Sequence, residues 1–238
     1  MHPVKKQHYV PRFYLSGFTS ENNDQLYVLD KENNNCFKKN IKEVCEQNYF
    51  YSFYVEELEE YYFMLEEHLG KKESEFSFVF RELIDNIECY YYKRNGKFNR
   101  LSNNKKKLIY EFIIYQIIRV PKFVDKLFSI VVSEFKKSNK ENGIEQSDKE
   151  IINDIKKYTF PNLFNKAEEV IPILSRKKWT FYIISEKINM SFISSDNPIL
   201  ITNSDIKSQT RGALIDPMTE ISFPISKNIA LVYCNIQT

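Results

Sequence analysis

The spacing of apolar residues changes twice along this chain of 238 residues, and that change limits the fold more than any other feature. Residues 1–54 and 178–238 contain short runs rich in β-branched and aromatic side chains, which are typical of strands. Residues 55–177 repeat their apolar side chains with the period of about 3.6 residues of an amphipathic helix. The order predicts an α+β fold in a single domain, residues 1–238: a mixed or antiparallel sheet built from the N- and C-terminal segments, with an inserted helical bundle.

The middle region predicts long helices. One apolar stripe covers residues 58–69 and another covers 76–87, which indicates one long helix or two consecutive helices. A third covers 108–135 and is apolar around much of its circumference, so we expect a buried helix. Pro121 removes a backbone donor inside that helix, which predicts a kink near Arg119.

Charge and glycine content exclude several classes of protein. Lys and Arg total 34 against 32 Asp and Glu, a formal net charge of +2, so no global positive field draws the chain to nucleic acid or to an anionic membrane. Any nucleic-acid or phosphate site must therefore be a small, local cleft. Only 5 glycines occur, and the phosphate-binding glycine motifs and the G-x-S-x-G motif are absent, which disfavours nucleotide-hydrolysing and hydride-transfer enzymes.

The remaining composition points to a protein of the cytoplasm. The N-terminus has no apolar run of the kind found in secretory signals, and no stretch approaches about 18 consecutive apolar residues. The 4 cysteines form no C-x-x-C pair, and 3 histidines are too few for a His-rich metal site. We therefore expect a soluble cytoplasmic protein with no membrane partner and with reduced cysteines.

Several motifs far apart in the chain form a set. Residues 6–18 read KQHYVPRFYLSGF, and 26–31 read LYVLDK. Residues 116–121 read QIIRVP, and near the C-terminus 192–198 read FISSDNP and 223–226 read FPIS. Together they resemble the bacterial family of domains of unknown function numbered 4238, over nearly the whole chain. The resemblance implies strands that flank helices, in proteins that usually continue past the last strand found here.

The N-terminal motif carries the first candidate site residues. His8 and Arg12 lie four residues apart across Pro11 and are able to share a helix face. Imidazole titrates near neutral pH, which suits His8 to acid–base catalysis, and the guanidinium of Arg12 suits phosphate or carboxylate binding. Asp196 ends an expected strand and is a candidate base, orienting group or ligand of a divalent metal. If both segments join one sheet, these three side chains converge as phosphodiester chemistry requires.

A structural alternative stands beside each of these roles. His8 is suited to bonding a backbone carbonyl, and Arg12 to pairing with a buried carboxylate. The Asp196-Asn197-Pro198 sequence is typical of an Asx turn, although Asn197 is also a candidate binding residue. Tyr9 offers a stacking surface for a nucleic-acid base or, alternatively, core packing.

Two of the chain's seven arginines, Arg12 and Arg119, fall inside the motifs. Arg119 lies with Gln116 on the helix expected to be buried, and an isolated buried charge costs several kcal/mol. We therefore expect Arg119 to pair with Asp196, with Asp30 or with a ligand anion, and we include Gln116 and Arg119 among the binding residues.

Two hypotheses from different classes follow. The first is a nuclease or other phosphodiester-processing enzyme with His8 and Asp196 as catalytic residues, a nucleic acid or phosphorylated ligand as partner, and a divalent metal as an open question. The resemblance to an uncharacterised bacterial family suggests defence against phage as its setting. The second is a non-enzymatic ligand- or protein-binding module in which the same residues organise the junction between sheet and bundle. The apolar C-terminal run NIALVYC also suggests an edge strand that pairs with a second copy.

Overall fold

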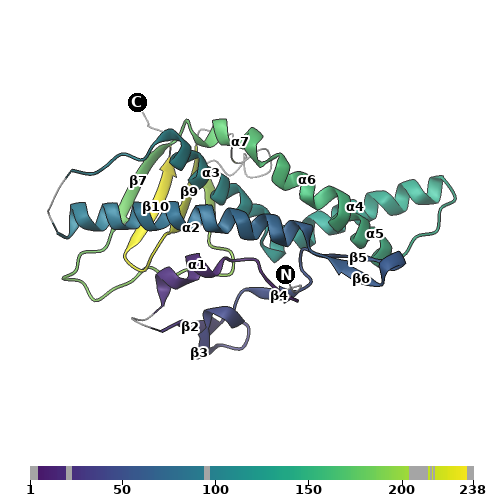
Figure 1. Ribbon diagram of the computed structural model, residues 1–238, viewed down its shortest axis with the longest axis horizontal. Helices are drawn as coiled ribbons and strands as arrows, with labels where there is room; N and C mark the ends of the chain where they lie inside the picture. Colours follow the sequence, from purple (N-terminus) through teal and green to yellow (C-terminus); the bar gives the residue numbers. More distant parts are fainter. Residues whose placement is uncertain are drawn as a thin grey trace.

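Helix α2 (Met64–Tyr91) is the longest element of the fold. It runs along the molecule, with a four-stranded sheet toward one end and the hairpin of β5 (Phe53–Val55) and β6 (Glu60–Tyr62) at the other (Figure 1). The computed structural model describes residues 5–19, 23–93, 97–203, 214, 216 and 218–234. Its helices and antiparallel sheets confirm the α+β class.

The main sheet comes entirely from the C-terminal region. Its strands are β7 (Lys178–Ile183), β8 (Leu200–Asn203), β9 (Thr219–Pro224) and β10 (Ile229–Cys234). They lie in the order β7-β10-β9-β8, and all neighbours are antiparallel. Because β10 lies between β7 and β9, it is not the edge strand that the sequence suggested for pairing with a second copy. Among the described strands of this sheet, β7 and β8 are the edges.

The N-terminal strands form two-stranded sheets of their own and do not extend the main sheet as the sequence predicted. β1 (Lys6–His8) pairs with β4 (Glu46–Asn48), and β2 (Gln25–Asp30) pairs with β3 (Asn35–Asn40). Pro11 precedes helix α1 (Arg12–Leu15), so the extended segment ends soon after β1. The N-terminal segment therefore reaches the main sheet through α1 and the 3-10 turn Ser16–Phe18.

Helix α2 is continuous through Gly70, which decides between the one-helix and two-helix alternatives. The apolar residues at 58–62 do not belong to it, contrary to the predicted stripe. Glu56–Leu58 is a 3-10 turn, and Tyr61 and Tyr62 lie on strand β6. Aromatic residues favour strands, and over so short a run their spacing satisfies both periods.

Two helices replace the single kinked helix predicted over 108–135. They are α3 (Asn103–Ile118) and α4 (Pro121–Glu141). Val120 has an extended ψ of 144°, because a residue before proline avoids the helical conformation, and Pro121 opens α4. Arg119 therefore lies in a sharp break, at the C-terminal end of α3.

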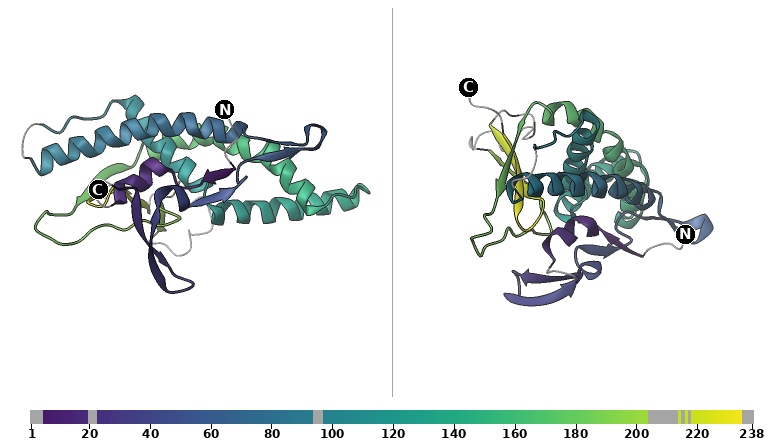
Figure 2. Two further views of the ribbon diagram at one scale, coloured as in Figure 1. Left: turned by 60° about the horizontal axis from the view of Figure 1, so that its bottom comes forward. Right: turned by 60° about the vertical axis from the view of Figure 1, so that its left-hand side comes forward.

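The core lies between α2, α3 and one face of the main sheet (Figure 2). Phe112 of α3 packs edge-on against Phe80 of α2, with ring centroids 4.6 Å apart, and lies 6.1 Å from Phe223 of β9. The chain returns to the sheet through α5 (Asp148–Asp154), a π-helical turn (Ile155–Thr159), α6 (Phe160–Asn165) and α7 (Ala167–Leu174). In the described part of the chain, no helix is both long and apolar enough to cross a membrane.

Candidate functional site

The motif segments from the two ends of the chain meet in the structure. The Tyr14 hydroxyl donates a hydrogen bond of 2.7 Å to the carbonyl of Pro224 and lies 2.9 Å from the Ser194 hydroxyl. The carbonyl of Gly17 accepts a bond of 3.0 Å from the Lys227 backbone. A Cβ atom on Gly17 would lie 3.2 Å from the Ile225 carbonyl oxygen, so a side chain would crowd this contact. The N-terminal motif thus docks on the two C-terminal motifs.

Two buried glutamines hold the backbone around β1. Gln7 donates to the Ser52 hydroxyl at 2.7 Å and accepts from the Tyr51 backbone at 2.7 Å. Gln116 of α3 donates to the Tyr9 carbonyl at 2.9 Å. Its Oε1 atom is buried and has no hydrogen-bond partner among the described residues. Gln116, expected to bind a ligand, therefore uses its amide nitrogen on the protein's own backbone.

Arg119 is only 2% exposed, and the structure pairs it with Glu73. Its Nη2 donates to the Glu73 carboxylate at 2.8 Å and to the His8 carbonyl at 2.6 Å, while Nε donates to the Tyr51 hydroxyl at 3.0 Å. Burial opposes the charge, but Tyr51 and Glu73 together raise the pKa of Arg119 above its ordinary value. Arg119 is buried and paired as expected, but the partners named from the sequence, Asp196 and Asp30, are wrong: the carboxylate that pairs with it is Glu73.

His8 ends strand β1 and Arg12 begins helix α1, so the two residues do not share a helix face as their spacing suggested, although the charge of Arg12 acts on His8. The half-buried His8 ring donates its Nε2–H to the Ile41 carbonyl at 3.2 Å, which leaves Nδ1 as a free acceptor in the neutral ring. Burial lowers the pKa of His8, and the nearby charge of Arg12 lowers it further, against the effect of the Ile41 bond. Arg12 is exposed and has no hydrogen bond or ion pair with the described residues. Its guanidinium is therefore available to an anion.

Glu66, in the first turn of α2, completes what we call the N-terminal cluster: His8, Arg12, Glu66, Glu73 and Arg119. Its half-buried carboxyl has no hydrogen bond or ion pair with the described residues. Burial raises the pKa of Glu66 to about 7, even though the charges of Arg119 and Arg12 lower it. The negative charge of Glu73 also raises the pKa of Glu66, so burial and Glu73 together outweigh the two arginines and the helix N-terminus, which favours a carboxylate.

Glu66 was not among the residues singled out from the sequence. The available signal was an acidic residue at the border of an apolar helical stripe, beside Leu65 and Leu69. Such residues are common at the edge of a helix, and the sequence did not show that two arginines from other elements approach this one. The site was therefore not recoverable from the spacing alone.

Asp196 lies with Tyr9 and Cys45. Burial and the charge of the exposed Asp196 together raise the pKa of Cys45 to about 12. Both effects also raise the pKa of Tyr9, whose hydroxyl bonds the Cys45 thiol. The charges that act on His8 come from Arg12, Glu73 and Glu46, and neither Asp196 nor Glu66 is one of them. Glu66 belongs to the cluster through Arg119, Glu73 and Arg12, whose charges act on its carboxyl. The structure thus brings His8, Arg12 and Arg119 into one cluster and places Asp196 beside Tyr9.

The side chain of Ser195 stabilises the turn at Asn197. The Ser195 hydroxyl donates to the Asn197 carbonyl at 2.8 Å and accepts from the Asn197 backbone N–H at 3.1 Å. Both Asp196 and Asn197 are exposed. Within the described ranges, no group of three or more His, Cys, Asp or Glu side chains is arranged to hold a metal ion.

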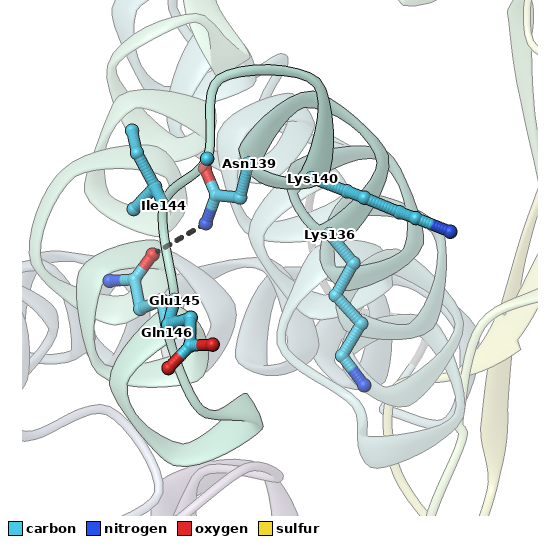
Figure 3. Close-up of a pocket in the computed structure, with 7 residues that line it drawn as sticks. Lys136, Asn139, Lys140, Ile144, Glu145 and Gln146 are labelled. Carbon is cyan, nitrogen blue, oxygen red and sulfur yellow. Dashed lines mark hydrogen bonds between the residues drawn. The ribbon is translucent and has the colours of Figure 1, made fainter.

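An open pocket of about 400 Å³ lies where α4 meets the connection to α5 (Figure 3). Asn139 donates to Gln146 at 3.1 Å, and Gln146 donates to Asp154 at 2.8 Å. Lys136 forms an ion pair with Asp148, and the Lys140 side chain points away from the Asn139–Gln146 bond. Three of the polar residues that line this pocket, Lys136, Asn139 and Gln146, therefore already have partners within the protein.

Comparison with known proteins gives one match. The sequence matches the family model described as protein of unknown function (DUF4238) over residues 6–237. No curated protein and no solved structure matches the chain. The matched range includes every motif segment that meets around β1, α1 and the main sheet, and on that match the chain belongs to the DUF4238 family.

Proposed function

We propose that the protein is a phosphodiester-processing enzyme in which His8 and Glu66 exchange protons with the substrate and Arg12 binds its phosphate. One observation carries the proposal. The half-buried, unpaired carboxyl of Glu66 and the His8 imidazole with its free Nδ1 come from separate elements, and both lie within reach of the charge of Arg12, an exposed guanidinium that is itself unpaired among the described residues. A base, an acid and an anion clamp are the groups that such a reaction requires.

The protonation states favour complementary roles at neutral pH. His8 is mostly neutral because its pKa lies below the ordinary value of 6.5, so Nδ1 is able to accept a proton. Glu66 is partly protonated because its pKa is about 7, so it is able to donate one. A base and an acid whose pKa values lie near the working pH give the most effective proton transfer.

The other members of the cluster position these groups. Arg119 holds the His8 carbonyl and Glu73, and thereby joins β1 to α2 behind the proposed site. Glu73 neutralises Arg119, so the guanidinium that remains for a phosphate is that of Arg12. In this proposal Glu66 takes the catalytic part that the sequence suggested for Asp196.

The test is cleavage of fluorescent RNA and DNA pools of mixed sequence by the wild-type protein, with EDTA, Mg²⁺ or Mn²⁺. We expect cleavage in EDTA and a loss of about 100-fold or more in Glu66→Gln and in His8→Gln, whose amide nitrogen still reaches the Ile41 carbonyl. Glu67→Gln and Arg81→Gln, which alter exposed residues of the same helix, serve as matched controls and should keep wild-type rates.

Three results would contradict the proposal. No cleavage of either pool would remove the activity, and a strict need for a divalent metal would contradict a mechanism based on side chains alone. Activity that survives Glu66→Gln but is lost in Asp196→Asn would return the catalytic role to Asp196.

A non-enzymatic binding protein is the second candidate, and a specific observation favours it. Gln7, Tyr14, Gln116 and Arg119, four polar side chains of the motifs, bond the protein's own backbone. In that case Arg12 binds an anionic ligand without turnover. The same pools distinguish the two candidates: retention of intact oligonucleotide that Arg12→Gln abolishes would support binding alone.

A role in defence against phage forms part of this proposal as its biological setting. It predicts that cells expressing the protein resist infection and that Glu66→Gln removes the resistance. The measurement is the plating efficiency of a phage panel on cells with wild-type protein, Glu66→Gln or Glu67→Gln. Equal plating on all three would contradict it.

A further inference from the structure

We infer that the substrate is RNA, cleaved by attack of its own 2′-hydroxyl on the adjacent phosphorus. This inference rests on the proposed function and names its substrate class. The described groups of the N-terminal cluster are a free imidazole nitrogen, an unpaired carboxyl and an unpaired guanidinium. They are suited to a reaction whose nucleophile the substrate already carries in place.

The 2′-hydroxyl supplies that nucleophile. It is held next to the phosphorus by the ribose itself, and well-oriented intramolecular groups act at effective concentrations far above those of a free reactant. DNA lacks this group, so its cleavage requires the protein to bind and activate a water molecule. Cleavage of RNA therefore requires only proton transfer and charge stabilisation from the three side chains of the cluster, whereas cleavage of DNA also requires a bound water molecule.

The bond changes balance with these residues. His8 Nδ1 takes the proton of the 2′-hydroxyl while the bond between O2′ and phosphorus forms. The bond between phosphorus and O5′ breaks, and Glu66 gives its proton to O5′. The products are a 2′,3′-cyclic phosphate and a 5′-hydroxyl, and a proton returns from His8 to Glu66 through solvent. Arg12 stabilises the charge that builds on the phosphoryl oxygens.

An exposed tyrosine stack next to Glu66 suits the bases of single-stranded RNA. Tyr61 of β6 is 38% exposed and stacks on Tyr49 with ring centroids 4.0 Å apart. The Lys5 ammonium lies 5.8 Å from the centre of the Tyr49 ring. Phe63 links β6 to α2, so the stack adjoins the helical turn that carries Glu66. Aromatic faces stack with nucleic-acid bases without regard to sequence.

The charges around the β5–β6 hairpin favour one path for a bound RNA strand. Its tip carries a group of glutamates that repel phosphate: Glu56, Glu57, Glu59 and Glu60. Lys5 and Arg12 lie toward β1 and α1. We therefore expect the RNA backbone to run from the tyrosine stack toward Arg12, and we expect Tyr61→Ala to raise KM about 10-fold with little change in kcat.

The experiment compares four fluorescent oligonucleotides of one mixed sequence: all RNA, all DNA, DNA with a single ribonucleotide, and all 2′-O-methyl RNA. We expect cleavage of the all-RNA oligonucleotide and of the chimera at its single ribonucleotide. Mass spectrometry should identify a 2′,3′-cyclic phosphate and a 5′-hydroxyl. The other two oligonucleotides should remain intact, and Glu66→Gln should abolish both cleavages while Glu67→Gln preserves them.

The outcomes separate this inference from the proposed function. Cleavage of all-DNA or 2′-O-methyl RNA at rates similar to RNA would overturn the inference and leave a phosphodiester-processing enzyme in place. Products with a 3′-hydroxyl and a 5′-phosphate would do the same. Failure to cleave any of the four would overturn both.

Discussion

Helix α2 carries two groups of polar side chains that differ in whether every member has a partner. The first, which we call the interhelical cluster, joins His68 and Lys72 of α2 to Glu111 and Tyr115 of α3. Lys72 lies 2.9 Å from the Glu111 carboxylate, and His68 lies 3.1 Å from the Tyr115 hydroxyl, which also bonds Glu111. Each of the four side chains has at least one partner within the protein.

The N-terminal cluster is satisfied only in part. Arg119 and Glu73 are paired, but Glu66 and Arg12 have no partner among the described residues. Buried polar groups are ordinarily paired because an unpaired one loses its bonds to water without replacement. The comparison teaches that every member of the interhelical cluster has a partner in the folded chain, whereas the N-terminal cluster leaves an acid and a cation available to a ligand.

The largest effect is expected where a paired charge is fully buried. Arg119→Met would leave the Tyr51 hydroxyl and Glu73 without the donor Arg119 and would leave the His8 carbonyl with only the longer bond of 3.2 Å from the Tyr51 hydroxyl, so we expect a loss of about 3 to 5 kcal/mol in the free energy of unfolding. Urea denaturation measures it, with exposed Arg100→Met as the matched control. A loss below about 1 kcal/mol would show that Arg119 does not join β1 to α2.

The interhelical cluster should show a smaller effect on stability. Lys72→Met leaves the Glu111 side chain, which is 4% exposed, without its ion-pair partner. Because Lys72 itself is partly exposed, we expect a loss of about 1 to 3 kcal/mol. The neighbouring exposed Lys71→Met is the control. If the two variants unfold at the same urea concentration, Glu111 does not depend on Lys72.

The sequence predicted the class of the fold because the spacing of apolar residues depends on whether a segment is a helix or a strand, and not on how the segments are arranged in space. It did not predict the separate N-terminal sheets, since strand pairing depends on contacts distant in sequence. Tyr61 and Tyr62 illustrate a local failure, because spacing alone fits either a helix or a strand over five residues. Pro121 was expected to kink a helix, and its effect on Val120 was strong enough to end one.

The part of the candidate site that could be predicted from the sequence is the part that follows from the chemistry of single residues. A buried arginine requires a partner, so the pairing of Arg119 followed from the sequence, but the choice of Glu73 depends on how α2 lies beside α3. His8 and Arg12 were found because they are close in the chain. Glu66 was not found, because its raised pKa arises from burial against elements that the sequence does not place.

Glu66 gives a test in which stability depends on pH. Its pKa is about 7 in the folded protein and 4.5 in the ordinary reference state, so the folded protein retains a proton that the unfolded chain releases. The stabilisation from that proton is fully present below pH 4.5 and is lost as the pH rises through 7.

We therefore expect Glu66→Gln, which remains neutral, to become more stable than wild type as the pH rises. After allowance for solvent screening, the relative gain between pH 4.5 and pH 8 is on the order of 1 to 2 kcal/mol. Urea midpoints at several pH values measure the gain, and exposed Glu67→Gln is the control. The same stability difference at every pH would mean that Glu66 titrates normally.

Arg12 should affect stability least and titration most clearly. Arg12→Gln removes an exposed, unpaired side chain, so we expect a change below about 0.5 kcal/mol in the free energy of unfolding. The charge of Arg12 lowers the pKa of both His8 and Glu66, so both pKa values should rise without it. An NMR titration of the His8 ring, assigned with His8→Gln, measures the shift without reference to activity.

The pH dependence of cleavage should follow the same two groups. In the proposed mechanism kcat/KM rises as His8 loses its proton and falls as Glu66 loses its proton near pH 7, so both limbs should move to higher pH in Arg12→Gln. Arg81→Gln, at an exposed position farther along α2, should leave both limbs and the His8 titration unchanged. If His8 titrates alike in wild type and Arg12→Gln, the two side chains are not close enough to act on one phosphate. The N-terminal cluster would then differ from the interhelical cluster only in how deeply its side chains are buried.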